Sequence, residues 1–133
     1  KTSSNTLLIL YNDFALNYNF LEIDNIGKVI KNKKIESPSY LPDNVIEIEN
    51  GHFFLTGYSQ TQIVASLFSK NLNLLSSRVI NGGNNSGDDY ATSMTEFKKN
   101  VYILSQSSTQ TGNDKKADYF GGYDYWLLKL KPF

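Results

Sequence analysis

Short stretches in which hydrophobic and polar residues alternate recur along the whole chain, separated by segments rich in Asn, Gly, Ser and Asp. In one of them, Ile46 and Ile48 project to one side while Glu47 and Glu49 project to the other, as in a half-buried antiparallel strand. No stretch of ten or more residues has the apolar spacing of an amphipathic helix. The pattern predicts an all-β protein with about ten strands. They are expected at residues 6–11, 16–23, 28–35, 44–48, 52–58, 62–68, 74–80, 90–96, 101–106 and 123–130.

The chain also contains an internal repeat. A shift of 48 residues places 53–59 on 101–107, and it places Ile46 on Met94. A second register relates 19–24 to 126–131. A unit of about 45–50 residues with four short strands has the period of a β-propeller blade. The repeat therefore predicts antiparallel four-stranded blades.

Divided in this way, residues 1–133 form a single β-propeller segment of about two and a half blades. The expected units are a half blade at 6–23, a blade at 28–68 and a blade at 74–131. Because a closed propeller typically needs at least four blades, further blades or further copies of the chain would have to complete the ring. A closed β-barrel or a sandwich is the alternative fold.

Three segments of the last unit form a recognisable motif: Gly82-Gly83, Asp88-Asp89-Tyr90-Ala91 and Asp124-Tyr125-Trp126-Leu127-Leu128-Lys129-Leu130. With these residues the unit resembles a repeat of secreted bacterial cell-surface β-propellers, and the likeness is specific over residues 79–131. The resemblance implies an extracellular binding or scaffolding module with no catalytic residues.

Charge and composition exclude several functions. Thirteen basic residues balance thirteen acidic ones, and only one basic residue is Arg, which argues against nucleic acid as a partner. The absence of cysteine excludes disulfides and thiolate chemistry. The longest uncharged aliphatic run covers residues 7–10, too short to cross a bilayer. A chain that begins at Lys1 fits a processed secreted protein or an excised fragment. The resemblance to secreted surface propellers implies an extracellular or cell-surface location.

Residues 81–89 are dense in oxygen ligands, and Asp88 and Asp89 are the candidate metal ligands. They could bind Ca²⁺, although Thr92 stands where an EF-hand loop would end in Glu. Alternatively, the glycines shape a turn and the carboxylates accept backbone N–H bonds at its base. No other cofactor is expected.

The long connection at 107–124 carries the candidate ligand-binding residues Asp114, Asp118, Tyr119 and Tyr123. Tyrosine rings could stack on sugars while carboxylates bind their hydroxyls, or the segment could be a flexible linker. Nothing fixes the separation that Asp118 and Asp124 would need as a glycosidase pair. The sequence thus favours a non-enzymatic module for protein binding or surface assembly, in which copies of the chain could associate. A carbohydrate-binding propeller is the alternative.

Overall fold

A computed structural model describes residues 2–13, 17–35, 40–83 and 87–131. All ten expected strands are present, and the described residues include no α-helix, only the three-residue 3-10 turn Glu49–Gly51. The prediction of an all-β protein is confirmed. The strands are β1 (Leu7–Asn12), β2 (Tyr18–Ile23), β3 (Val29–Lys34), β4 (Leu41–Ile48), β5 (His52–Ser59), β6 (Gln62–Phe68), β7 (Leu74–Ile80), β8 (Asp89–Phe97), β9 (Asn100–Ser107) and β10 (Asp124–Leu130).

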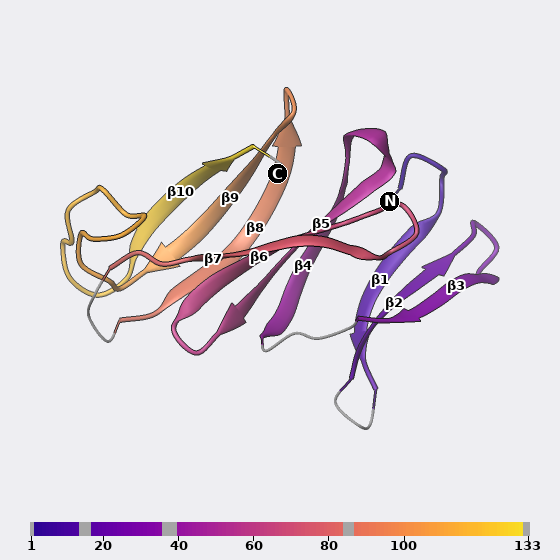
Figure 1. Cartoon of the computed structure of the whole chain (residues 1–133), viewed down its shortest axis with the longest axis horizontal. Coiled ribbons are helices and arrows are strands. Elements are labelled where there is room, and N and C mark those ends of the chain that lie inside the picture. Colours follow the sequence, from indigo (N-terminus) through magenta and orange to yellow (C-terminus); the bar gives the residue numbers. More distant parts are fainter. Residues whose placement is uncertain (1, 14–16, 36–39, 84–86, 132–133) are drawn as a thin grey trace.

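The strands form three antiparallel sheets that follow one another along the long axis of the molecule (Figure 1). The first sheet contains β1-β2-β3, the middle sheet β4-β5-β6-β7 and the third sheet β8-β9-β10. In each sheet, strands that are consecutive in the chain are neighbours. The described strands therefore do not form a closed barrel.

The expected division of the chain into blades is wrong in its boundaries. The unit at 28–68 was expected to form one sheet, but β3 pairs with β2, and β7 pairs with β6 rather than with the strands that follow it. The physical reason lies in the turns. The Asp24 carboxylate accepts hydrogen bonds from the backbone N–H groups of Ile26 and Lys28, which closes the β2–β3 hairpin tightly. A similar turn from Ser69 to Asn73 keeps β7 beside β6.

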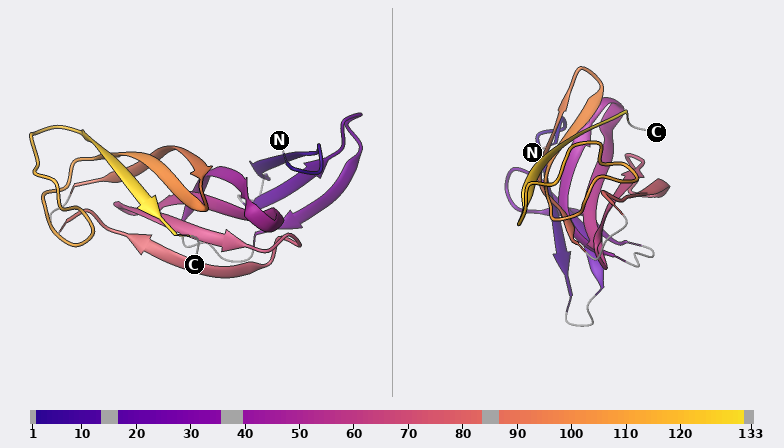
Figure 2. Two further views of the ribbon diagram at one scale, coloured as in Figure 1. Left: turned by 90° about the horizontal axis from the view of Figure 1, so that it is seen from above. Right: turned by 90° about the vertical axis from the view of Figure 1, so that its left-hand side faces the viewer.

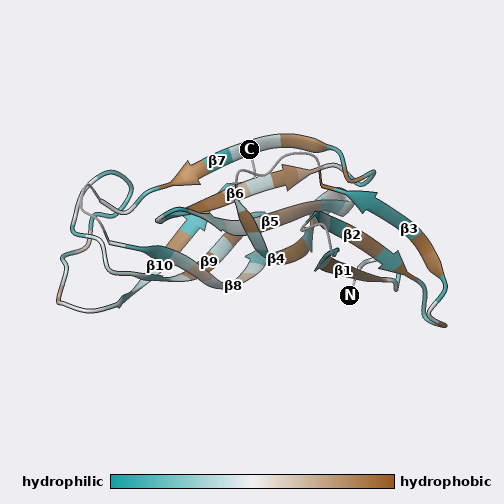
Figure 3. Cartoon of the chain, turned by 90° about the horizontal axis from the view of Figure 1, so that it is seen from below, coloured by the Kyte–Doolittle hydropathy of each residue, from teal (hydrophilic) through white to brown (hydrophobic). Residues whose placement is uncertain are grey.

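The two central strands of the middle sheet, β5 and β6, are buried on both faces. Alternation along β5 directs Phe54 toward the third sheet and Phe53 and Leu55 toward the first, so that one strand contributes to two cores. β6 alternates in the same way, and hydrophobic residues occupy long parts of these two strands (Figure 3). The three sheets consequently pack face to face as a stack, which two further views also show (Figure 2).

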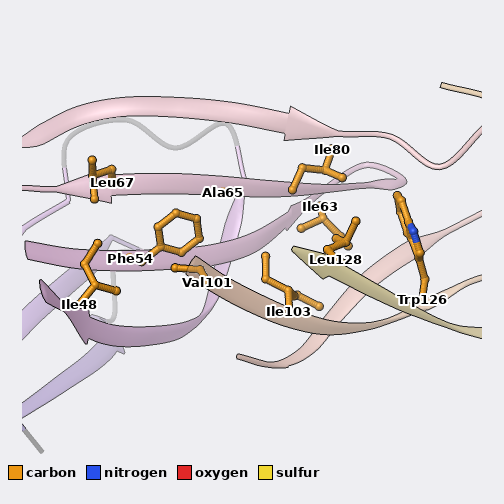
Figure 4. Close-up of a cluster of buried hydrophobic side chains, with 11 residues drawn as sticks. Ile48, Phe54, Ile63, Ala65, Leu67, Ile80, Val101, Ile103, Trp126 and Leu128 are labelled. Carbon is orange, nitrogen blue, oxygen red and sulfur yellow. The ribbon is translucent and has the colours of Figure 1, made fainter. Parts of the chain in front are cut away.

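The larger core lies between the middle and third sheets (Figure 4). Trp126 and Leu128 of β10 point into it, as the alternation along that strand predicts, and they pack near Ile63 of β6. The second core lies between the first and middle sheets, where the rings of Phe20 and Phe68 meet edge to face at 5.1 Å. Its buried members are Phe20, Ile35, Tyr40, Phe53, Leu55, Val64, Phe68 and Leu72.

β4 contacts both β1 and β8, so the first strands of the three sheets succeed one another along one side of the stack. Within the described part of the chain, no helix is long and apolar enough to span a membrane.

Candidate functional site

Three connections meet at one end of the stack, which we call the loop end. They are the β5–β6 turn at 60–61, the described residues 81–83 and 87–88 of the β7–β8 connection, and the β9–β10 connection at 108–123, which lies at the extremity of the molecule (Figure 1). The backbone N–H of Asp114 donates to the carbonyl of Asn81 at 2.9 Å, and that of Asp89 donates to Thr61 at 3.1 Å. The connections are thus hydrogen-bonded to one another rather than independent.

Asp89 anchors the loop end from inside. Its carboxylate is fully buried and accepts hydrogen bonds from the backbone N–H of Gly82 at 2.7 Å and from the Thr109 hydroxyl at 3.0 Å. Gly82 is required at this point, because a Cβ there would overlap Thr109 Oγ1 and approach both Asp89 oxygens. This geometry matches the alternative in which the carboxylate supports a turn.

Lys115 is a second internal anchor, with only 1% of its surface exposed. Its ammonium group donates to the Thr109 carbonyl at 2.9 Å and lies 3.7 Å from an oxygen of Asp124. It also lies 5.8 Å from the ring centroid of Tyr119. A buried charge is tolerated only when it is paired and hydrogen-bonded, so these contacts tie the long connection to the start of β10.

A tyrosine cluster, formed by Tyr58, Tyr90 and Tyr123, lies beside these anchors. The rings of Tyr58 and Tyr90 stack at 4.6 Å, and the ring of Tyr123 lies 6.2 Å from that of Tyr90. Tyr90 donates to the Tyr58 hydroxyl at 3.5 Å, which in turn donates to the Asp88 carboxylate at 3.3 Å. The cluster brings together residues from three separate parts of the chain.

The hydroxyl chain changes the acidity of its members. The hydrogen bond to Tyr58 raises the pKa of Tyr90 to about 12, from an ordinary value of 10.0. Partial desolvation of its hydroxyl, followed by the proximity of Tyr90, raises the pKa of Tyr123. Because the folded state holds the Tyr90 proton more tightly than the unfolded state, this bond stabilises the fold fully below pH 10.0, and the contribution is lost as the pH rises through 12.

The tip of the long connection presents exposed aromatic rings in an ordered turn. The backbone N–H of Gly122 donates to the Tyr119 hydroxyl at 3.1 Å, and that of Phe120 donates to the Asp124 carboxylate at 3.1 Å. Gly121 and Gly122 have φ values of 101° and 69°, which glycine adopts without strain. Phe120 is nevertheless 84% exposed. We call Tyr119, Phe120 and Tyr123 the aromatic rim.

The predicted ligand-binding residues fall into two groups. Tyr119, Tyr123 and Asp118 are exposed at the loop end, where a ligand could reach them. Asp114 is engaged differently, because its carboxylate pairs with Arg78 at 3.0 Å and accepts the backbone N–H of Asn81 at 3.0 Å. A ligand role for these four residues stays a prediction.

The predicted metal ligands Asp88 and Asp89, at the start of β8, bind different partners. Asp89 faces inward onto Gly82 and Thr109, while Asp88 accepts the Tyr58 hydroxyl. Among the described residues, no group of three or more His, Cys, Asp or Glu side chains could hold a metal ion. Residues 84–86, which belong to the same oxygen-rich stretch, lie outside the described residues. Ca²⁺ binding by Asp88 and Asp89 stays a prediction.

Sequence reasoning overlooked Tyr58, Tyr90 and Lys115. Tyr58 and Tyr90 are 32 residues apart and belong to different sheets, so no local pattern pairs them. Lys115 lies in a polar stretch where a lysine is expected in solvent. The weak available signal is the position of both tyrosines at strand ends that border turns.

The arrangement is suited to non-covalent recognition, because it presents aromatic rings and carboxylates on a rigid support. No protein-family model matches the chain, and no curated protein matches it at a significant level.

Proposed function

We propose that this chain is a non-enzymatic β-propeller module that acts at a bacterial cell surface and binds a protein partner through its aromatic rim. The stack of antiparallel meanders supports the propeller assignment, since a propeller consists of such sheets packed face to face. The succession of β1, β4 and β8 along one side is what the innermost strands of adjacent blades would form.

One observation carries the binding role. The aromatic rim is exposed, yet its support is tied down by the buried Asp89 and Lys115. A flexible linker does not bury a lysine and a carboxylate, and it does not hold a residue such as Phe120 in a hydrogen-bonded turn. Rigid exposed aromatic side chains bind with little loss of conformational entropy and dominate the energetics of many protein interfaces.

The engagement of three carboxylates supports the non-enzymatic part of the proposal. Asp89, Asp114 and Asp124 each accept hydrogen bonds from the backbone or from neighbouring side chains that support the loops. A general acid or base needs a carboxyl group that is free to exchange a proton with a substrate.

The experiment is selection of a phage-displayed peptide library against the immobilised chain. We expect enriched peptides whose binding falls at least tenfold with Phe120→Ser or Tyr123→Ser, on the order of the loss when an interface aromatic is removed. Lys98→Ser, in the β8–β9 turn, is the control and should leave binding unchanged. Failure to enrich any peptide, or equal binding by the rim variants, would contradict the proposal.

A saccharide ligand is the second candidate, and the tyrosine cluster favours it. Tyr123 is exposed beside Tyr90, and Asp88 supplies a carboxylate through Tyr58. A sugar stacks on an aromatic ring while acidic groups accept its hydroxyls. A glycan array distinguishes the two candidates, because binding that depends on Tyr123 but not on Phe120 would favour the saccharide.

A further inference from the structure

The outer face of the third sheet is an uncovered hydrophobic surface. Trp126 and Leu128 point toward the middle sheet, so the intervening residues of β10 point away from it. Leu127 lies directly beside Leu104 of β9 in the strand register, and it is 66% exposed. Tyr125, two positions earlier on the same face, is 81% exposed. Apolar residues in such a cluster indicate an interaction surface.

In the middle sheet, the corresponding face is covered by the third sheet. β9 and β10 are the second and third strands of their meander, as β5 and β6 are of theirs. In the middle sheet, the face that carries Phe54, Ala65 and Leu67 forms the core against the third sheet. In the equivalent pairing of β9 and β10, Tyr102 corresponds to Phe54, and Leu127 and Lys129 correspond to Ala65 and Leu67. The outer face of the third sheet is therefore the counterpart of a surface that already binds a sheet.

The opposite end of the stack has a matching surface. Leu8, Leu10 and Phe20 of the first sheet pack toward the middle sheet, so their neighbours in the strands face outward. Ile9 is paired with Leu21 across β1 and β2 on this outer face, where both side chains are half-buried. The third sheet binds the middle sheet through residues of the same kind, among them Val101 and Ile103 of its central strand.

We infer that a second copy of this chain docks the outer face of its first sheet onto the outer face of the third sheet. The inference rests on the stacked arrangement used in the proposed function, but it does not involve the aromatic rim. The interface would continue a sheet-on-sheet contact that the chain already makes twice. The chain has a formal net charge of zero, so two copies do not repel each other through their net charge. The contact is head to tail, so it closes into a ring or extends into a filament.

The first test is the mass in solution, measured by analytical ultracentrifugation over a range of concentrations. We expect a multiple of 15.0 kDa for the native chain and a monomer for Leu127→Glu, with unchanged circular dichroism. Leu75→Glu is the matched control, because Leu75 is 53% exposed on β7, away from both outer faces, and it should leave the assembly intact. A native chain that stays monomeric at every concentration would overturn the inference.

The second test determines the orientation of the copies and uses the absence of native cysteine. A mixture of chains carrying Leu127→Cys with chains carrying Leu21→Cys should form a mixed disulfide under mild oxidation. Rapid disulfide formation by Leu127→Cys alone would indicate a face-to-face dimer and would refute the head-to-tail arrangement. Phe120→Ser should assemble normally, so failure of the rim proposal and failure of this inference give different results.

Discussion

Single buried polar residues decide the shape of the loop end. Asp89 and Lys115 occupy positions where neither side chain can reach water, and each is surrounded by partners that neutralise or satisfy it. Thr109 links them, because its hydroxyl donates to Asp89 while its carbonyl accepts from Lys115. Such networks rigidify a loop when every member is satisfied, and they are costly when one member is removed.

Replacement of Asp89 by Asn should destabilise the fold. The amide is neutral and retains one acceptor oxygen, so the two charge-assisted hydrogen bonds from Gly82 N–H and the Thr109 hydroxyl cannot both be kept. We expect a loss of about 1–3 kcal/mol in the free energy of unfolding, measured by urea titration. Asp118→Asn, at an exposed position, should change it by less than about 0.5 kcal/mol.

The Asp89→Asn variant also tests whether Asp89 is a structural carboxylate or a metal ligand. Added Ca²⁺ should leave the melting temperature of the native chain unchanged if Asp89 serves only Gly82 and Thr109. A rise in melting temperature with Ca²⁺ that Asp89→Asn abolishes would contradict the structural assignment.

Strands and turns set which side chains reach the cores. β10 alternates between buried and exposed residues, and the first strands β4 and β8 each contain an irregularity in register near their start, at Asp43 and Thr92. The hairpins differ in length: β4 and β5 are joined by three residues, whereas Lys98 and Lys99 alone join β8 to β9. Both lysines have positive φ, as a two-residue hairpin turn of type I′ requires.

The shorter turn corrects the repeat alignment. A constant shift of 48 residues places Ile46 on Met94 and Phe54 on Tyr102. In the middle sheet, Ile46 is paired with Phe54. In the third sheet, however, Tyr102 is paired with Thr95 rather than with Met94. Ile46 and Met94 both pack against the core between the middle and third sheets, but Ile46 shares a face with Phe54, whereas Met94 shares the opposite face of its own sheet with Ile103. Loss of one turn residue therefore moves the first strand by one position and exchanges its two faces.

Truncation of Trp126 tests the packing of β10. Trp126→Ala should lower the free energy of unfolding by about 3–5 kcal/mol, because it removes a large buried ring from the core that Ile63 and Leu128 share. Lys129→Ala, on the exposed face of the same strand, should cost less than about 1 kcal/mol. Chemical denaturation of both variants measures the difference, and equal losses would show that β10 does not pack as described.

At the scale of the whole molecule, the middle sheet holds the structure together. Both cores depend on it, so neither outer sheet can keep its buried face without it. β7 is the exception within this sheet, because most of its residues are exposed at the edge. The stack should consequently unfold from its edges inward.

Native-state hydrogen exchange should reveal this order. We expect the slowest amide exchange in β5 and β6, which are buried on both faces, and faster exchange in β3 and β7 at the sheet edges. Exchange measured by NMR or mass spectrometry would contradict this view of the stack if β3 were protected as strongly as β5.

The candidate site was predictable only in part. Tyr119, Tyr123 and Asp118 could be identified because a long polar connection with aromatic residues is visible in the sequence. The stacking of Tyr58 on Tyr90 could not, because it depends on how the turn after β5 meets the start of β8. Burial of Lys115 likewise depends on Thr109 and Asp124 approaching from both ends of the connection.

The alternation of hydrophobic and polar residues was enough to predict the ten strands and, within most of them, the side chains that are buried, because a period of two is a local property of each strand. The positions at which one sheet ends and the next begins become visible only in the folded molecule. That boundary depends on whether a turn is tight enough to keep two strands hydrogen-bonded, as at Asp24, or lets the chain cross to a new layer, as it does after Ile80. The open outer faces of the first and third sheets follow from these boundaries and from the order of the layers.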